Sequence, residues 1–284
     1  MMGNFVNNTS IKYLGKVLNV GGIWIFSLVF LFPFFWMITN AIRPSGEVFS
    51  LPPRFFPQTW QWENFYIAWT QLPFARFFFN SFVVSVAVVF IFVSTSILAA
   101  FAFSRLRWKY REVVFMSYLS TLMVPSLLLV IPLFLVVNKL GWVNTYAGLI
   151  IPVAFGSYAV FLLRQFFLGI PIELEEAARI DGASNWRILI DVIVPLSIPS
   201  IGLVTLFAFI SSWSSFIWPL IVVNDSDYAT LPVGLTLFQT QMGTDWNYIM
   251  AGSAISMIPG IILAVLLQKF IYNGLALNTG FGGR

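Results

Sequence analysis

The sequence has 284 residues, of which 59% are hydrophobic, 18% aromatic and only 9% charged, far from the composition of soluble globular proteins. The absence of Cys and His excludes disulfides, thiolate and imidazole metal ligands and a Ser-His-Asp nucleophile, so we expect neither a catalytic site nor a metal site. The formal charge is only +4 and the 15 Lys and Arg form no stripe that could follow a phosphate backbone, so no nucleic-acid partner is expected.

Six apolar runs without a charged residue dominate the chain. A helix that crosses a bilayer needs about 20 mostly apolar residues, and each run reaches that length. The runs are residues 20–42, 77–104, 113–138, 140–163, 192–224 and 246–268. The first run is too long for a signal peptide, and residues 39–43 lack a small-x-small cleavage pattern, so we interpret it as a retained span. The sequence therefore predicts an all-α, multi-pass membrane protein with six transmembrane helices.

The connection between the first two runs, residues 43–76, is rich in Pro and aromatic residues. This composition favours an ordered, largely non-helical cover over the outer face. A short helix is expected within it, near residues 63–70.

Uncharged polar residues gather in two of the runs. They are Asn80, Ser81 and Ser85 in the second run, and Ser211, Ser214 and Ser215 in the fifth. The aromatic residues Trp213 and Trp218 accompany the serines of the fifth run. An aromatic ring beside hydroxyl groups suits a sugar, which offers both C–H faces and hydroxyls, so these residues are the candidate substrate pathway. Helix packing is the alternative for each Ser, because small polar side chains also mediate it in membranes. No run holds an Asp, Glu, Lys or Arg, which disfavours a secondary transporter driven by protons or sodium.

The distribution of Lys and Arg predicts the orientation. If both termini lie inside, the inner segments hold 11 of these residues and the outer segments four. The inner ones are Lys12, Lys16, Arg105, Arg107, Lys109, Arg111, Arg164, Arg179, Arg187, Lys269 and Arg284, and the outer ones are Arg43, Arg54, Arg76 and Lys139. Because Lys and Arg resist translocation, we expect the N- and C-termini to be cytoplasmic.

The inner loop of residues 164–191 is the one stretch where charge, helical spacing and turn chemistry coincide. It holds five of the 11 acidic residues: Glu173, Glu175, Glu176, Asp181 and Asp191. The three glutamates lie where carboxylates complement the positive end of a helix dipole, which predicts a short helix from Ile172 to Asp181. Gly182 suits the left-handed position after such a helix, and Ser184 can cap a second helix.

One side of the first helix is small and weakly apolar, because Leu174, Ala177, Ala178 and Asp181 fall at positions i, i+3, i+4 and i+7. Such a side permits close docking of another protein. A solvated connector with ordinary caps is the alternative interpretation.

The sequence of this loop resembles a family motif. Glu176-Ala177-Ala178-Arg179-Ile180-Asp181-Gly182-Ala183, followed by Val192-Ile193-Val194-Pro195, resembles the EAA loop of ABC importer permeases. That motif is EAA, three residues, Gly, nine residues, then Ile-x-Leu-Pro, and the chain keeps its spacing. Asp181-Gly182-Ala183, with Trp213-Ser214-Ser215-Phe216-Ile217-Trp218-Pro219-Leu220, is similar to the carbohydrate-uptake branch, which includes maltose and glycerol-phosphate permeases.

The resemblance implies a type I ABC importer permease fold in a bacterial cytoplasmic membrane. The helix from Ile172 to Asp181 would be the coupling helix, in which Glu176 makes polar contacts, Ala177 and Ala178 allow close approach, and Gly182 sets the turn. The residues implied for ATPase coupling are Glu173, Leu174, Glu176, Ala177, Ala178, Asp181, Gly182, Ala183 and Pro195.

The resemblance also implies the partners: ATPase subunits, a second permease subunit and an extracytoplasmic solute-binding protein. The chain has no G-x-x-x-x-G-K-[ST] phosphate loop, so ATP would be bound by the partner, and no cofactor is expected in this chain. The expected function is to form half of the pathway for a sugar, oligosaccharide or polyol. A permease for a polyol phosphate or other solute, and a membrane scaffold that transports nothing, are the alternatives.

The expected organisation has three parts. Residues 1–19 are a cytoplasmic N-terminal segment, residues 20–273 are the six-helix permease domain with the coupling loop at 164–191, and residues 274–284 are a cytoplasmic tail.

Overall fold

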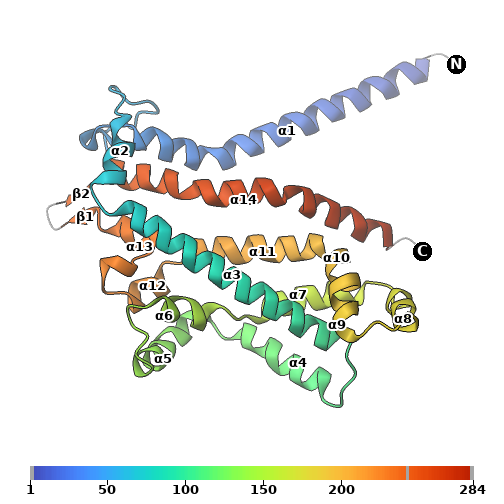
Figure 1. Cartoon of the computed structure of the whole chain (residues 1–284). Coiled ribbons are helices and arrows are strands. Elements are labelled where there is room, and N and C mark those ends of the chain that lie inside the picture. The colour runs from blue at the N-terminus through green and yellow to red at the C-terminus, as the bar shows by residue number, and fades with distance from the viewer. Residues whose placement is uncertain (1–2, 241–242, 282–284) are drawn as a thin grey trace. The chain divides into compact units, whose positions relative to one another are not determined.

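The computed structural model describes residues 3–240 and 243–281, and within those ranges its regular secondary structure is helical apart from one short hairpin (Figure 1). The all-α prediction is therefore confirmed. The helices are α1 (Gly3–Ala41), α2 (Glu63–Thr70), α3 (Phe74–Ser104), α4 (Arg111–Ser120), α5 (Ser126–Lys139), α6 (Tyr146–Ile150), α7 (Ser157–Leu168), α8 (Glu173–Ile180), α9 (Asn185–Arg187), α10 (Val194–Leu196), α11 (Ile198–Trp213), α12 (Ile217–Val222), α13 (Leu231–Thr236) and α14 (Trp246–Phe281). A π-helical turn, Ile188–Ile193, joins α9 to α10, and strand β1 (Gln239–Thr240) pairs antiparallel with β2 (Gly243–Thr244).

Three helical segments are long and apolar enough to cross a membrane: Asn19–Ala41 in α1, Phe74–Ser104 (α3) and Trp246–Lys269 in α14. Three further candidates are pairs of helices bent at a short break. They are Arg111–Met123 with Ser126–Lys139 (101°), Tyr146–Val153 with Ser157–Leu168 (45°), and Asn185–Leu196 with Ile198–Trp213 (79°). If each bent pair counts as one span, the described residues contain the six spans that the sequence predicts.

The breaks have local causes that an apolar run does not reveal. Val124 is extended because the residue before a proline is disfavoured in the helical region, and Pro125 then occupies the N-cap position before α5. Gly156 is extended before α7, and a side chain there would meet the ring of Phe92 at 2.8 Å. Pro199, in the first turn of α11, lacks an amide hydrogen, which separates α11 from α10.

The chain divides into two compact units. The first comprises residues up to Gln71 together with Phe238–Ile255. In it, the Asn64 side chain of α2 donates hydrogen bonds to the carbonyls of Ala41 (2.9 Å) and Arg43 (2.8 Å), which closes the end of α1. The connection after α1 is thus ordered, and α2 has the bounds that the sequence predicts.

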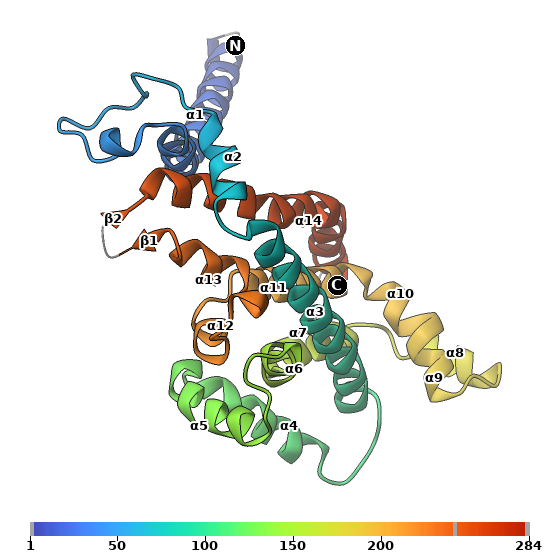
Figure 2. The ribbon, with the colours of Figure 1, turned by 60° about the vertical axis from the view of Figure 1, so that its left-hand side comes forward.

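The second unit comprises Leu72–Leu237 and the chain from Ser256 onward. Its centre is α3, which packs against both α7 and α11. Buried side chains from all three helices and from the segment after α9 form one core, including Phe101, Leu163, Phe167, Ile188 and Val204. This core continues to the end of the unit where α8 and α9 form a hairpin (Figure 2).

The expected part boundaries do not coincide with breaks in secondary structure. Helix α1 is continuous from residue 3 through residue 19, and α14 continues past residue 274 to Phe281. The last residues of the expected tail, 282–284, lie outside the described residues.

Candidate functional site

The hairpin of α8 and α9 has a sharply defined turn. Gly182 adopts φ +81°, the left-handed conformation that the sequence predicts. Its amide donates to the Arg179 carbonyl (3.0 Å), and the Ala183 amide donates to the Ala178 carbonyl (2.9 Å). These two bonds form a Schellman motif, and the Ser184 hydroxyl then caps the next helix by accepting from the Arg187 amide at 3.4 Å. The direction of α8 relative to α9 is therefore fixed by backbone bonds.

Helix α8 presents two different faces. Glu173, Glu176 and Ala177 are exposed, and Ile180 is 87% exposed although it is a large apolar residue. On the opposite face Glu175 is buried and Ala178 is half-buried against the core of the second unit. Of the side that the sequence predicts for docking, Leu174, Ala177 and Asp181 are exposed, whereas Ala178 faces inward.

Arg105 joins α8 to two membrane-spanning helices. It follows the last residue of α3 and donates hydrogen bonds to the carbonyls of Phe167 (2.6 Å) and Ile170 (2.8 Å), at the end of α7. Its Nε lies 2.5 Å from Oε1 of Glu175, and both side chains are at least nine-tenths buried. Burial raises the pKa of the Glu175 carboxyl, and the Arg105 cation opposes this shift. One guanidinium thus connects α3, α7 and α8.

A second arginine connects the same ends of α3, α4 and α7. The Nε of Arg164 donates to the Phe103 carbonyl (3.0 Å), and its Nη2 bonds both carboxylate oxygens of Glu112 (2.7 and 3.0 Å). The guanidinium carbon also lies 4.0 Å from the ring centroid of Phe115. The ends of α3, α4 and α7, next to which the hairpin lies, are therefore held together by charged and backbone interactions as well as by apolar packing.

A cavity of about 800 Å³ lies within the second unit. Its lining is mostly apolar and includes hydroxyl groups and aromatic rings. The members that the sequence predicts as pathway residues are Ser81, Ser211, Ser214, Ser215 and Trp218. Among the described residues that line it, none is charged. Such a surface can form hydrogen bonds and ring contacts with a neutral polar molecule.

The fifth run does not form one helical stripe, because α11 ends at Trp213 and α12 begins at Ile217. Ser214 and Ser215 lie in the break between these helices. Trp213 is buried outside the cavity and donates to the Ser256 carbonyl at 2.8 Å. Trp218 lines the cavity while its indole N–H donates to the Gly148 carbonyl at 3.0 Å.

The polar residues early in α3 hold another segment of the chain. The Asn80 amide donates to the carbonyls of Asp227 and Ala229 (both 2.9 Å) and accepts from the Tyr146 hydroxyl at 2.7 Å. The Ser81 hydroxyl, at the cavity wall, accepts from the Leu231 amide at 2.7 Å. Asn80 and Ser85 are buried and do not line the cavity.

The arginine network was not predicted. From the sequence, Arg105 and Arg164 are only inner charges, and Glu175 is only one of three acidic residues in a first turn. The available signal was the position of Arg105 directly after the second apolar run, at the level where the loop of residues 164–191 also leaves the membrane.

The sequence matches a known family and is similar to two named transport proteins. The family model described as "Binding-protein-dependent transport system inner membrane component" matches residues 93–276. The chain is 33% identical to the arabinooligosaccharides transport system permease protein AraQ of Halalkalibacterium halodurans, over 93% of this chain and 96% of that protein. It is 35% identical to the sn-glycerol-3-phosphate transport system permease protein UgpE of Rhizobium meliloti, over 87% of this chain and 91% of that protein.

A solved structure has the same fold. It is a bacterial ABC transporter involved in the import of the acidic polysaccharide alginate, with a TM-score of 0.78 and 24% identity. The match covers 90% of this chain and 96% of that chain.

The multi-pass helical fold, the uncharged cavity and the anchored hairpin, together with these relatives, define a membrane transport subunit, a permease. More particularly, the chain belongs to the family of binding-protein-dependent transport system inner membrane components. The resemblance that the EAA-like loop indicated is confirmed.

Proposed function

We propose that this permease forms half of the translocation pathway of an ATP-driven importer for a sugar, oligosaccharide or polyol, and that a separate ATPase subunit drives it through α8. The observation that carries the proposal is the division of α8 into an exposed face and an anchored face. Exposed Glu176, Ala177 and Ile180 are available to a partner, while Glu175 and Ala178 connect the helix to the core. A partner that moves α8 therefore moves α3 and α7 with it.

The partners and orientation follow from the same arrangement and from the family. The hairpin would lie in the cytoplasm, with both termini on that side, in agreement with the 11 to four distribution of Lys and Arg. The ATPase subunits would bind there. A second permease would complete the pathway, and an extracytoplasmic solute-binding protein would deliver the solute at the other face.

A cysteine cross-link tests the docking face. The chain has no Cys, so Ala177→Cys provides a single thiol on the exposed face of α8. In the purified complex, we expect a thiol-to-amine cross-linker to join this position to an ATPase subunit, as resolved by gel electrophoresis and mass spectrometry. Ala178→Cys is the matched control, because its half-buried side chain should react much less. If only the control position reaches the ATPase, or neither does, the proposed face is wrong.

The solute class is supported by the uncharged cavity. Hydroxyls of Ser211, Ser214 and Ser215 beside Trp218 suit a neutral polyhydroxylated molecule. A relative named for sn-glycerol-3-phosphate makes a polyol phosphate the second candidate. An anion of that kind would have to find its cationic groups elsewhere in the complex, because no Lys or Arg is among the described cavity residues.

ATPase stimulation of the reconstituted complex tests the solute class. The complex would contain this chain, its partner permease, the ATPase subunits and the solute-binding protein. We expect at least one neutral sugar, oligosaccharide or polyol in a panel to stimulate ATP hydrolysis and to be taken up into vesicles. Stimulation by polyol phosphates alone would establish the second candidate, and stimulation by neither class would exclude both.

A further inference from the structure

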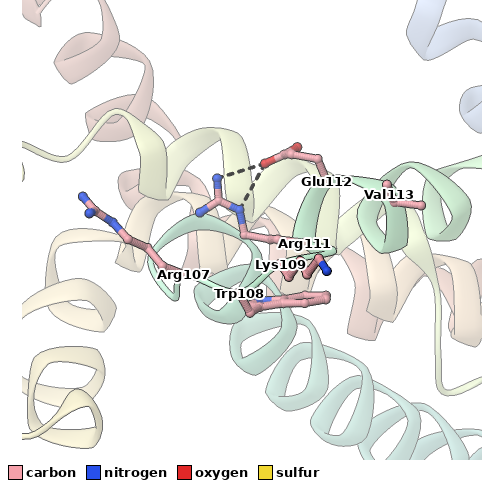
Figure 3. Close-up of a pocket in the computed structure, with 6 residues that line it drawn as sticks. All are labelled: Arg107, Trp108, Lys109, Arg111, Glu112 and Val113. Carbon is pink, nitrogen blue, oxygen red and sulfur yellow. Dashed lines mark hydrogen bonds and ion pairs between the residues drawn. The ribbon is translucent and has the colours of Figure 1, made fainter.

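A second pocket, of about 370 Å³, lies in the connection between α3 and α4 (Figure 3). Its six lining residues all lie within positions 107–113: Arg107, Trp108, Lys109, Arg111, Glu112 and Val113. It is far along the chain from the cavity residues of α11 and α12, shares no lining residue with the first cavity, and has no part in the proposed transport pathway.

The pocket has an excess of positive charge that the chain does not neutralise. Arg111 forms an ion pair with the carboxylate of Glu112 (3.0–3.1 Å), and the same carboxylate also pairs with Arg164. Arg107 is exposed and has no ion-pair or hydrogen-bond partner among the described residues. In Figure 3 its guanidinium points away from the Arg111–Glu112 pair. Among the described residues, Lys109 lies over the ring of Tyr110, at 5.3 Å from Nζ to the centroid, and forms no ion pair. Two cations are thus free to bind an anion.

The pocket lies where the headgroup region of a membrane is expected. It directly follows the 31-residue apolar helix α3 and precedes the apolar surface of α4, where Val113 and Met116 are more than 60% exposed. Trp108, exposed beside these cations, is an aromatic residue of the kind that prefers the headgroup level. The pocket also lies at the same end as α8, since the neighbouring Arg105 pairs with Glu175.

The pocket is held in place by contacts with the end of α3 and with α4. The Arg111 Nη1 donates to the Leu106 carbonyl at 3.2 Å, and the ring of Trp108 lies 6.0 Å from that of Phe103 in α3. Phe103 in turn contacts Phe115 of α4, at 5.4 Å between centroids. The two free cations are therefore presented from a fixed loop, not from a mobile tail.

From these observations we propose that the α3–α4 connection binds the phosphate headgroup of an anionic phospholipid. Arg107 and Lys109 bind the phosphate, and exposed Val113 contacts the start of an acyl chain. The apolar wall distinguishes a lipid from a free phosphate, which would use only the cations. The same connection carries Arg105, which pairs with Glu175, and leads to Glu112, which pairs with Arg164. The lipid would therefore lie beside the ends of α3, α4 and α7, close to the hairpin.

The test is native mass spectrometry of the purified complex after exchange into mixed phosphatidylcholine and phosphatidylglycerol. We expect retained phosphatidylglycerol, and loss of about 25-fold in affinity for Arg107→Gln with Lys109→Gln, since each cation near an anionic surface contributes about fivefold. Arg54→Gln with Lys139→Gln is the matched control, because it also removes one exposed Arg and one exposed Lys. Inorganic phosphate at the same concentration should not displace the lipid.

Three results would overturn the proposal. Equal phosphatidylglycerol retention in the test and control double variants would show that the lipid binds elsewhere. Displacement by inorganic phosphate would identify a site for a soluble anion. Loss of the ATPase subunit from the test variant, with lipid retention unchanged, would assign these cations to a protein contact. Because both substituted side chains are exposed, unfolding is not expected, and an unchanged thermal midpoint would verify this.

Discussion

Replacing Gly182 with Val should uncouple ATP hydrolysis from transport or release the ATPase subunit. At φ +81° an L-residue costs about 1–2 kcal/mol, and a β-branched residue costs more. No atom lies within 4 Å of the position that a Cβ would take, so the cost is in backbone conformation and not in a clash. The turn should relax by breaking the hydrogen bonds that the Gly182 and Ala183 amides donate, which changes the direction of α8. Solute uptake and ATPase activity of the reconstituted complex are the measurements.

Two control variants separate this effect from general destabilisation. Gly182→Asn should retain most of the coupling, because Asn tolerates the left-handed region. Gly141→Val places the same strain in the connection between α5 and α6, where φ is +71° and the space is also open. It should lower the thermal midpoint while uptake per ATP hydrolysed stays near the wild-type value. Normal coupling in Gly182→Val would contradict the role assigned to the turn.

Replacing Arg105 with Ala should have the largest effect on stability. It leaves the Glu175 carboxylate buried without its cation and leaves the carbonyls of Phe167 and Ile170 without a donor. Breaking a buried pair in this way costs about 3–5 kcal/mol. We expect a clear fall in the thermal midpoint in detergent and loss of coupled transport, whereas Arg54→Ala, which removes an exposed arginine, should change neither.

The defect of Arg105→Ala should depend on pH. Burial already raises the pKa of Glu175 despite the neighbouring Arg105, so this carboxyl is protonated more easily in the folded loop than in the unfolded chain. Stability from a group with a raised folded pKa is present below its unfolded pKa and is lost as the pH rises through the folded pKa. Removing Arg105 raises that pKa further. The stability difference from wild type should therefore be largest at alkaline pH, where the carboxyl is ionised, and shrink as the pH falls towards the ordinary pKa of a glutamate.

Two further substitutions make the Arg105 experiment specific. Adding Glu175→Gln to Arg105→Ala should recover part of the thermal midpoint, because no charge is then left buried. Arg105→Lys should be intermediate, since an ammonium keeps the charge but cannot bond Glu175, Phe167 and Ile170 with one planar group. A midpoint for Arg105→Ala equal to that of the wild type at every pH would exclude the anchoring role.

Much of the fold was predictable because membrane spans and caps are local signals. Apolar length located the six spans, and Gly182 with Ser184 located the turn of the hairpin. The break at Pro125 was not predicted, because hydropathy is the same on both sides of a bend.

Most of the site was not predictable because its bonds join distant segments. Three glutamates in one turn do not show which of them faces inward, and only the contact with Arg105 identifies Glu175. Likewise, Asn80 looks like any polar residue in a span until the carbonyls of Asp227 and Ala229 are found beside it. Pairings of this kind depend on the tertiary arrangement.

The single guanidinium shared by α3, α7 and α8 has a consequence for protein engineering. A chimera that exchanges only the hairpin, in order to accept the motor of another transporter, would separate Glu175 from the Arg105 with which it is matched. A functional graft must therefore carry the end of α3 along with the hairpin, although the two pieces are far apart in the sequence.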